Sequence, residues 1–349
     1  MSEVVVITGA TSGVGRAIVR RFAKDKASIA LIARDREGLD AARKEVEAAG
    51  GRAMVLPIDV SDHAAMEAAA KSVEEAFGPI DIWINDAMAT VFSWFWEIEP
   101  EEFQRSTDVT YHGYVWGTRA ALQHMMPRDR GTIVQVGSAM AYRGIPLQSP
   151  YCGAKAAIKN FQESLRTELR AKGSKVHLTM VQLPGVNTPQ FEHARAKMPK
   201  VPMPVPPVYQ PEVAADAVHY AAHHKRREIY VGLPTVYTIV GNKIAPGLVE
   251  RYLAKTGIKS QQTDQDLGQD VRPGNLESAP STDQGAHGPF DDMAHEHSIQ
   301  LMLTKHRAKI GALAGAAGVA AAVRRGASRD GHRAGRFTKV KDMLPVGGR

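Results

Sequence analysis

The amino-acid sequence predicts an α/β fold with a doubly wound parallel sheet, followed by a C-terminal extension. Apolar runs rich in Val and Ile alternate with helical patterns through the first 230 residues. Most of these runs are nearly continuous, as expected for strands that are covered on both faces of a sheet. Alternation of strands and helices at this spacing indicates parallel strands joined by crossover helices.

Seven runs are predicted as strands and four longer stretches as helices. The predicted strands are residues 4–7, 29–33, 53–56, 82–84, 132–136, 176–182 and 229–231. The predicted helices are residues 16–24, 39–49, 64–77 and 154–169. A Pro-rich stretch, residues 199–211, cannot hold regular structure for long and follows the sixth strand, where a lid or pocket wall would lie. Residues 211–258 again have a helical pattern, with one strand.

Composition and charge divide the chain into three parts. We expect a domain over residues 1–258, an acidic linker or extended arm over 259–300, and a basic, Ala/Gly-rich tail over 301–349. Residues 263–300 hold eight acidic side chains and one Arg, whereas residues 301–349 hold eleven Lys and Arg and two Asp. The tail is expected to be a mobile, solvated segment, with contact to an anionic membrane or an acidic partner as the alternative.

The remaining composition points to a cytoplasmic protein. One cysteine, Cys152, excludes an intramolecular disulfide and is interpreted as a packing residue. No signal-peptide pattern and no apolar run of 18 residues is present, so neither secretion nor an ordinary transmembrane helix is expected.

A glycine-rich turn follows the first predicted strand. The sequence TGATSGVG places Gly9, Gly13 and Gly15 between a strand and a helix, with Ser12 and Val14 in the same turn. Small residues let the backbone approach a pyrophosphate, and the helix N-terminus supplies free N–H groups. A tight structural turn without a ligand is the alternative.

The end of the second strand indicates which dinucleotide would bind. An acidic residue at this position often holds the ribose 2′-OH of NAD. Here Ala33 is followed by Arg34, whose guanidinium suits the 2′-phosphate of NADP, although Asp35 could partly offset its charge. We therefore expect NADP as the cofactor in preference to NAD.

Tyr151 and Lys155 are four residues apart, so they share one face of a helix. Such a pair is either an ordinary surface pair or a proton donor with the cation that tunes it. Spacing alone leaves both readings open.

An ordered series of motifs decides between them. Over roughly residues 1–240 the chain resembles the classical short-chain dehydrogenase/reductases, which have a Rossmann fold. In and around the family's cofactor-binding motifs, the corresponding positions are Thr8, Gly9, Ser12, Gly13, Val14, Gly15, Asp59, Val60, Asn85 and Ala87. Matching positions in the later half are Ser138, Tyr151, Lys155, Pro184, Gly185 and Thr188.

The resemblance implies an enzyme that interconverts an alcohol and a carbonyl by hydride transfer. Tyr151 would be the general acid/base, because a neighbouring ammonium favours the phenolate and lowers a pKa near 10. Lys155 would supply that ammonium and also bind the nicotinamide ribose, while Ser138 would orient the substrate oxygen. The resemblance further implies a small-molecule substrate and a homo-oligomer.

Three departures from the family pattern motivate an alternative. Asp86 and Met88 replace the second Asn and the Gly of N-N-A-G, and Thr110 stands where the family has a helix asparagine. The spacing from Pro184 and Gly185 to Thr188 is also one residue short. A nucleotide-binding sensor or scaffold that has lost turnover is therefore the rival hypothesis.

Other patterns carry less chemistry. Phe92, Trp94, Phe95 and Trp96 lie close together in the sequence and would either wall an apolar substrate pocket, with Met140 and Tyr142, or pack in the core or a subunit interface. The histidines show no metal-ligand spacing, so no metal site is predicted. The basic tail lacks interleaved aromatic residues, so no nucleic-acid partner is expected.

Overall fold

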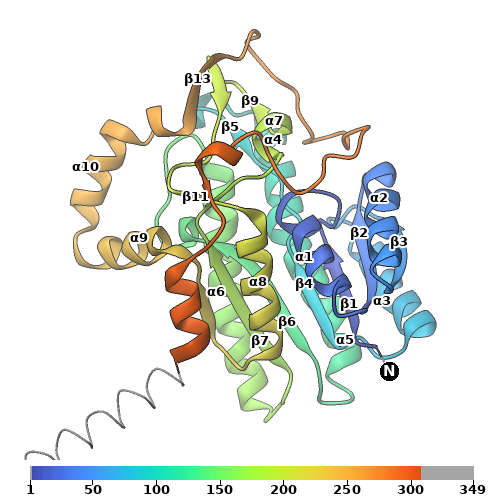
Figure 1. Cartoon of the computed structure of the whole chain (residues 1–349). Coiled ribbons are helices and arrows are strands. Elements are labelled where there is room, and N and C mark those ends of the chain that lie inside the picture. Colours follow the sequence, from blue (N-terminus) through green and yellow to red (C-terminus); the bar gives the residue numbers. More distant parts are fainter. Residues whose placement is uncertain (1, 308–349) are drawn as a thin grey trace, which may run out of the picture. The chain divides into compact units, whose positions relative to one another are not determined.

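The computed structural model describes residues 2–307, and its central element is a seven-stranded parallel sheet (Figure 1). The strands are β1 (Val4–Thr8), β2 (Ser28–Ala33), β3 (Arg52–Pro57), β4 (Ile82–Asn85), β6 (Thr132–Ser138), β7 (His177–Leu183) and β12 (Glu228–Tyr230). Their order is β12-β7-β6-β4-β1-β2-β3. The order reverses direction between β1 and β4, the kind of place where open α/β sheets bind ligands. The predicted doubly wound fold is confirmed.

Helices cover both faces of this sheet. On one face lie α1 (Gly13–Ala23), α2 (Arg36–Ala48) and α8 (Pro211–His223), and on the other lie α3 (His63–Phe77), α5 (Gly113–Met125) and α6 (Ser149–Ala171). Successive residues of β1 alternate between the two cores: Val5 and Ile7 pack with α1 and α8, whereas Val4 and Val6 pack with α3 and α5. This double burial explains the continuous apolar runs in the sequence.

Side-chain caps fix where several helices begin. Asp35 accepts hydrogen bonds from the backbone N–H groups of Glu37 and Gly38 and so starts α2. Asp62 caps α3 in the same way. Helix α4 (Pro100–Thr107) begins with a capping box and a proline, and continues through a π-helical turn, Asp108–His112, into α5. These caps satisfy N–H groups that a helix leaves free at its start.

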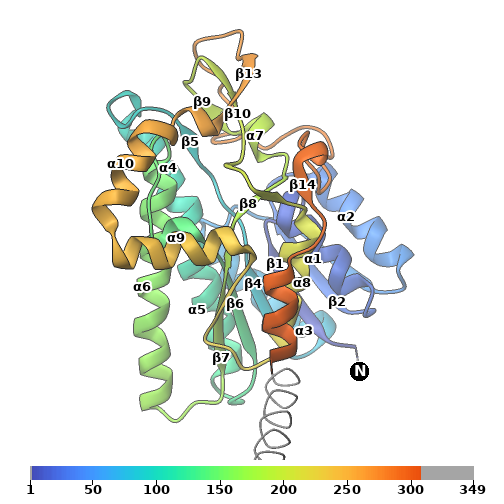
Figure 2. The ribbon, with the colours of Figure 1, turned by 60° about the vertical axis from the view of Figure 1, so that its left-hand side comes forward.

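Smaller elements gather above the carboxyl ends of the strands. They are β5 (Val91–Phe92), β8 (Gly185–Val186), α7 (Gln190–His193), β9 (Arg195–Ala196), β10 (Lys200–Pro202), β11 (Val208–Tyr209), β13 (Gln262–Asp266) and β14 (Ala294–His295). They pair as β10 with β13, β5 with β9, and β11 with both β14 and β8. Two further helices, α9 (Gly232–Ile244) and α10 (Pro246–Thr256), follow β12, as Figure 2 shows.

The segment predicted as an acidic linker or extended arm packs on the fold. We call residues 262–295 the C-terminal arm. Its strand β13 pairs with β10, its strand β14 pairs with β11, and its Leu276 is fully buried. The described residues up to Leu301 form one compact unit, and a second begins at Met302. Whether residues 1–258 fold by themselves stays a prediction.

Most of the predicted basic tail, residues 308–349, lies outside the described residues, and so does any contact it makes with a membrane or partner. Between residues 2 and 307, none of the helices combines the length and the apolar character needed to span a bilayer.

Candidate active site

A pocket opens at the carboxyl ends of the central strands. Of the site residues predicted from the sequence, those that line it are Gly9, Ser12, Gly13, Val14, Arg34, Asp59, Val60, Ala87, Ser138, Tyr151, Lys155, Pro184, Gly185 and Thr188. Thr8, Gly15 and Asn85 do not line it. Met203, Pro204 and Val205 of the Pro-rich stretch also line the pocket, so this stretch is the predicted wall.

The glycines of the first turn are required by geometry. Gly9 and Gly13 have φ angles of +72° and +56°, a region that side chains with a Cβ rarely adopt. A Cβ on Gly15 would lie 2.0 Å from the Gly9 carbonyl oxygen, so only glycine lets α1 approach β1 this closely. The turn therefore brings the backbone and the start of α1 to the pocket.

Thr8 and Asn85 support the pocket from behind. The Thr8 hydroxyl accepts hydrogen bonds from the backbone N–H groups of Asp86 and Ala87, at 3.0 and 3.2 Å. Asn85 is fully buried; its side chain donates to Gln135 and Thr118 and accepts from Trp83. Both residues hold the end of β4 in place, and their predicted part in binding the cofactor stays a prediction.

Arg34 and Asp59 form the end of the pocket next to β2 and β3. Arg105 donates to the Asp59 carboxylate and to the Ser61 hydroxyl, and Arg34 lies 4.0 Å from the same carboxylate. Burial raises the pKa of Asp59, but hydrogen bonds from Arg105 and Ser61 outweigh burial and hold the pKa below its usual range. Two guanidinium groups thus face one carboxylate here.

Ser138, Tyr151 and Lys155 meet at the other end of the pocket. Ser138 ends β6, and the other two lie one turn apart near the start of α6. Burial raises the pKa of the Tyr151 phenol above its ordinary value, and a hydrogen bond with the Ser138 side chain opposes this shift. The Lys155 Nζ lies over the Tyr151 ring, 5.5 Å from its centroid. The lowered pKa expected for Tyr151 is therefore not what this structure gives, because burial dominates.

Lys155 is held by a tyrosine that the sequence analysis missed. Its Nζ donates to the Tyr114 hydroxyl at 2.8 Å and to the Val136 carbonyl at 2.7 Å, and the Tyr114 hydroxyl donates to the same carbonyl at 2.8 Å. Tyr114 is 1% exposed and Lys155 is 2% exposed. No local motif marks Tyr114 in the sequence, because its role depends on a contact with Lys155, 41 positions later in the chain.

Thr110 has no contact with this triangle. Its hydroxyl accepts from the backbone N–H of Ala89 and donates to the carbonyl of the same residue, at 2.9 and 2.8 Å. The side chain is fully buried within the π-helical turn. Thr110 therefore fixes the loop after β4 and does not take over the role of the family's asparagine through a direct contact with Lys155.

Asp86 places a carboxyl group in the pocket between the glycine turn and Lys155. It lines the pocket and accepts a hydrogen bond from the backbone N–H of Gly15. Burial raises the pKa of this carboxyl to about 7, although the Lys155 charge and the Gly15 N–H act in the opposite direction. Burial also lowers the pKa of the Lys155 ammonium, and the Asp86 charge opposes that change. The site therefore holds two titratable groups that stabilise each other's charge.

The aromatic cluster and Cys152, which the sequence also singled out, do not join the catalytic set. Phe92 is buried against Phe191, whereas Phe95 and Trp96 are 63% and 75% exposed, and none of them lines the pocket. Met140 does line it. Cys152 is buried, and burial raises the pKa of its thiol to about 11, in keeping with the predicted packing role. Among residues 2–307 no three His, Cys, Asp or Glu side chains gather as a metal site would require.

Comparisons with known proteins agree with this arrangement. Residues 3–199 match the family model for short chain dehydrogenases. An uncharacterized oxidoreductase of Bacillus subtilis, YxnA, is 32% identical over 264 residues, which is 75% of this chain and 74% of that protein. A fatty acyl-CoA reductase of Acinetobacter baylyi is 29% identical over 248 residues, covering 70% of this chain and 81% of that protein.

A solved structure is similar as well. A metagenomic short-chain oxidoreductase in complex with NADP superposes with a TM-score of 0.56 and 27% identity, covering 66% of this chain and 97% of that chain. The match of the family model over more than half of the chain, together with the sheet order and the convergence of Ser138, Tyr151 and Lys155, is decisive. The chain belongs to the short-chain dehydrogenase/reductase family of NAD(P)-dependent oxidoreductases, which act on CH–OH and carbonyl groups.

Proposed function

We propose that this protein is an NADP(H)-dependent oxidoreductase that interconverts an alcohol and a carbonyl, with Tyr151 as general acid/base. One observation carries the proposal: a single pocket has a glycine-rich helix start and Arg34 at one end, and Ser138, Tyr151 and Lys155 at the other. The intact set of three argues against the alternative of a sensor without turnover.

The residues present fit a dinucleotide. Gly9, Ser12, Gly13 and Val14 form a backbone cradle at the start of α1, which suits phosphates because the helix N-terminus carries partial positive charge. Arg34 would hold a 2′-phosphate, and Asp59, Val60, Ala87, Pro184, Gly185 and Thr188 would complete the walls. Bound NADPH would supply the hydride.

The proton chemistry falls to Tyr151. Because burial raises its pKa, the phenol is protonated at neutral pH and its Oη is ready to give a proton to a carbonyl oxygen. Ser138, hydrogen-bonded to the phenol, would hold the same substrate oxygen.

Lys155 would place a positively charged ammonium beside Tyr151. Its contacts with Tyr114 and Val136 fix Nζ over the Tyr151 ring, where the Asp86 carboxylate favours the ammonium. The ammonium would stabilise the phenolate that forms when Tyr151 has given up its proton.

The lining of the pocket includes several large apolar side chains. Met88, Met140, Leu183, Phe191 and Met203 line it. One relative is named a fatty acyl-CoA reductase. We therefore propose a carbonyl compound with an apolar chain as the substrate, and a screen of such compounds of increasing chain length with NADPH would identify it. The proposal includes a homo-oligomer, for which exposed Leu233, Tyr237 and Ile244 of α9 offer an apolar contact surface.

The Tyr151→Phe variant tests the function. We expect NADPH affinity within about twofold of the wild type and turnover lower by about 10²–10⁴, the usual contribution of a general acid. Tyr142→Phe is the matched control, because the Tyr142 hydroxyl bonds Glu228 and does not line the pocket. Turnover of Tyr151→Phe equal to that of the control would disprove the role.

A further inference from the structure

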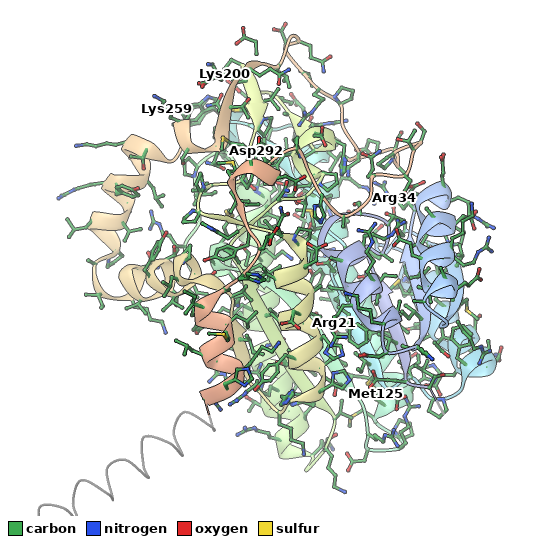
Figure 3. The ribbon with its side chains drawn as sticks, viewed as in Figure 1. Arg21, Arg34, Met125, Lys200, Lys259 and Asp292 are labelled. Carbon is green, nitrogen blue, oxygen red and sulfur yellow. The ribbon has the colours of Figure 1, made fainter. Side chains whose placement is uncertain are left out.

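The C-terminal arm returns from β13 to the N-terminal half of the sheet, where it crosses the glycine turn. Figure 1 shows the arm running beside α1 and α2, and Figure 3 shows Arg34 next to it. Asn275, Ala279, Pro280 and Gln284 of the arm line the same pocket as Gly9, Gly13 and Arg34. The pocket therefore has one wall that comes from the extension.

Arg34 is tied to the arm. Its guanidinium donates to the backbone carbonyls of Asn275, Leu276 and Glu277, at 2.5, 3.3 and 2.9 Å. Arg105 donates to the Leu276 carbonyl at 3.2 Å, and the Leu276 side chain is fully buried against the core. Both guanidinium groups at this end of the pocket thus hold the same short stretch of the arm.

An ion pair between a buried arginine and an exposed aspartate fastens the arm a second time. Arg16 of α1 is 1% exposed and bonds Glu45 of α2 on one side and Asp283 of the arm on the other, with Nη1 3.0 Å from Oδ1 of Asp283. Two residues on, the Gly285 carbonyl accepts the backbone N–H of Gly13 at 3.0 Å. The arm therefore occupies one of the free N–H groups at the start of α1, where a phosphate would bind.

From these contacts we propose that residues 275–285 form a strap over the adenosine and phosphate end of the cofactor site, which encloses NADP(H) and slows its release. This inference rests on the proposed cofactor. The strap has to leave Gly13 before a phosphate can take that N–H group, and it closes over the bound dinucleotide through Arg16 and Arg34. Cofactor exchange and strap opening are then one event.

The test compares two variants of the full-length chain. Asp283→Ala removes the strap's ion pair and leaves Arg16 its partner Glu45, so the core keeps its buried charge compensated. Glu67→Ala is the control, because it removes a surface pair with Arg119 far from the pocket lining. We expect the NADPH dissociation rate, followed by NADPH fluorescence in stopped flow, to rise about tenfold in Asp283→Ala and to stay at the wild-type value in Glu67→Ala.

Hydrogen exchange gives a readout without any substitution. In the wild-type chain we expect peptides covering residues 275–285 to exchange more slowly once NADPH is bound. An unchanged or slower dissociation rate in Asp283→Ala, or exchange in the strap that NADPH leaves unchanged, would overturn the proposal. A wild-type chain that binds neither NADPH nor NADH would instead refute the proposed function, so the two failures are distinguishable.

Discussion

Replacing Asp86 by asparagine should stabilise the protein at neutral and alkaline pH. Asparagine has the same shape, and its side-chain oxygen can still accept the hydrogen bond from the Gly15 N–H. The change removes a carboxyl group whose charge is poorly solvated in the pocket. Unlike most surface carboxylates, Asp86 opposes folding when it is ionised.

The magnitude follows from the pKa of Asp86. A pKa raised from 3.8 to about 7 corresponds to roughly 4 kcal/mol of penalty on the ionised form in the folded state. Asp86 keeps some contact with solvent in the pocket, and replacing it removes a favourable charge beside Lys155. We therefore expect the free energy of unfolding of Asp86→Asn to exceed that of the wild type by about 1–3 kcal/mol.

The sign of the pH dependence makes the prediction specific. Between pH 4 and 7 the folded state binds more protons at Asp86 than the unfolded state, so this group lowers stability as pH rises. The difference in unfolding free energy between Asp86→Asn and the wild type should therefore be small at pH 4, grow up to pH 7 and level off near pH 8. Urea unfolding of the cofactor-free proteins at several pH values measures it.

A control with the opposite sign is available in Glu45. Hydrogen bonds from Arg20 and Arg16 outweigh the effect of burial and hold the pKa of Glu45 at about 2. Glu45→Gln should therefore destabilise the protein at neutral pH, and its deficit should shrink as the pH falls from about 4.5 toward 2. A gain for Asp86→Asn that is the same at every pH, or a loss above pH 7, would refute the reasoning.

Two further changes test the contacts of Lys155 and Arg34. Tyr114→Phe removes one of the two oxygens that hold Lys155 Nζ. We expect the alkaline limb of the pH profile of kcat to shift and kcat to fall about tenfold, with KM for NADPH nearly unchanged. A pH profile that keeps its shape would exclude a positioning role. Arg34→Ala should lower the preference for NADPH over NADH, measured as the ratio of their dissociation constants, by about tenfold or more. A wild-type protein that binds both cofactors equally would contradict the role of Arg34 at the 2′-phosphate.

The fold and the catalytic set could be predicted because their signals are local. The strands β1 and β2 are nearly continuous apolar runs, and Ser138, Tyr151 and Lys155 stand at fixed distances along the chain. Parallel topology then brings the ends of β1, β4 and β6 together.

Other features of the site depend on contacts that no local pattern encodes. The ties from Arg34 and Arg16 to the arm join residues more than 240 positions apart, and the arm has no hydrophobic period that would reveal its path. The pKa of Tyr151 was expected to fall, because the sequence shows a neighbouring lysine but not the extent of burial. The contact of Tyr114 with Lys155 could not be predicted either, because it depends on how α5 packs against β6.

The ion pair between Arg16 and Asp283 also dictates an order of events during synthesis. Its two residues are 267 positions apart in the chain. At about 5–20 residues per second, a ribosome that has made Arg16 needs roughly 13 to 53 seconds more to reach Asp283. Until then Glu45 is the one of these two carboxylate partners of Arg16 that has been made, and the arm cannot yet contribute its wall to the pocket. Synthesis thus completes the strands of the sheet and the catalytic residues first, and residues 275–285 of the pocket wall last.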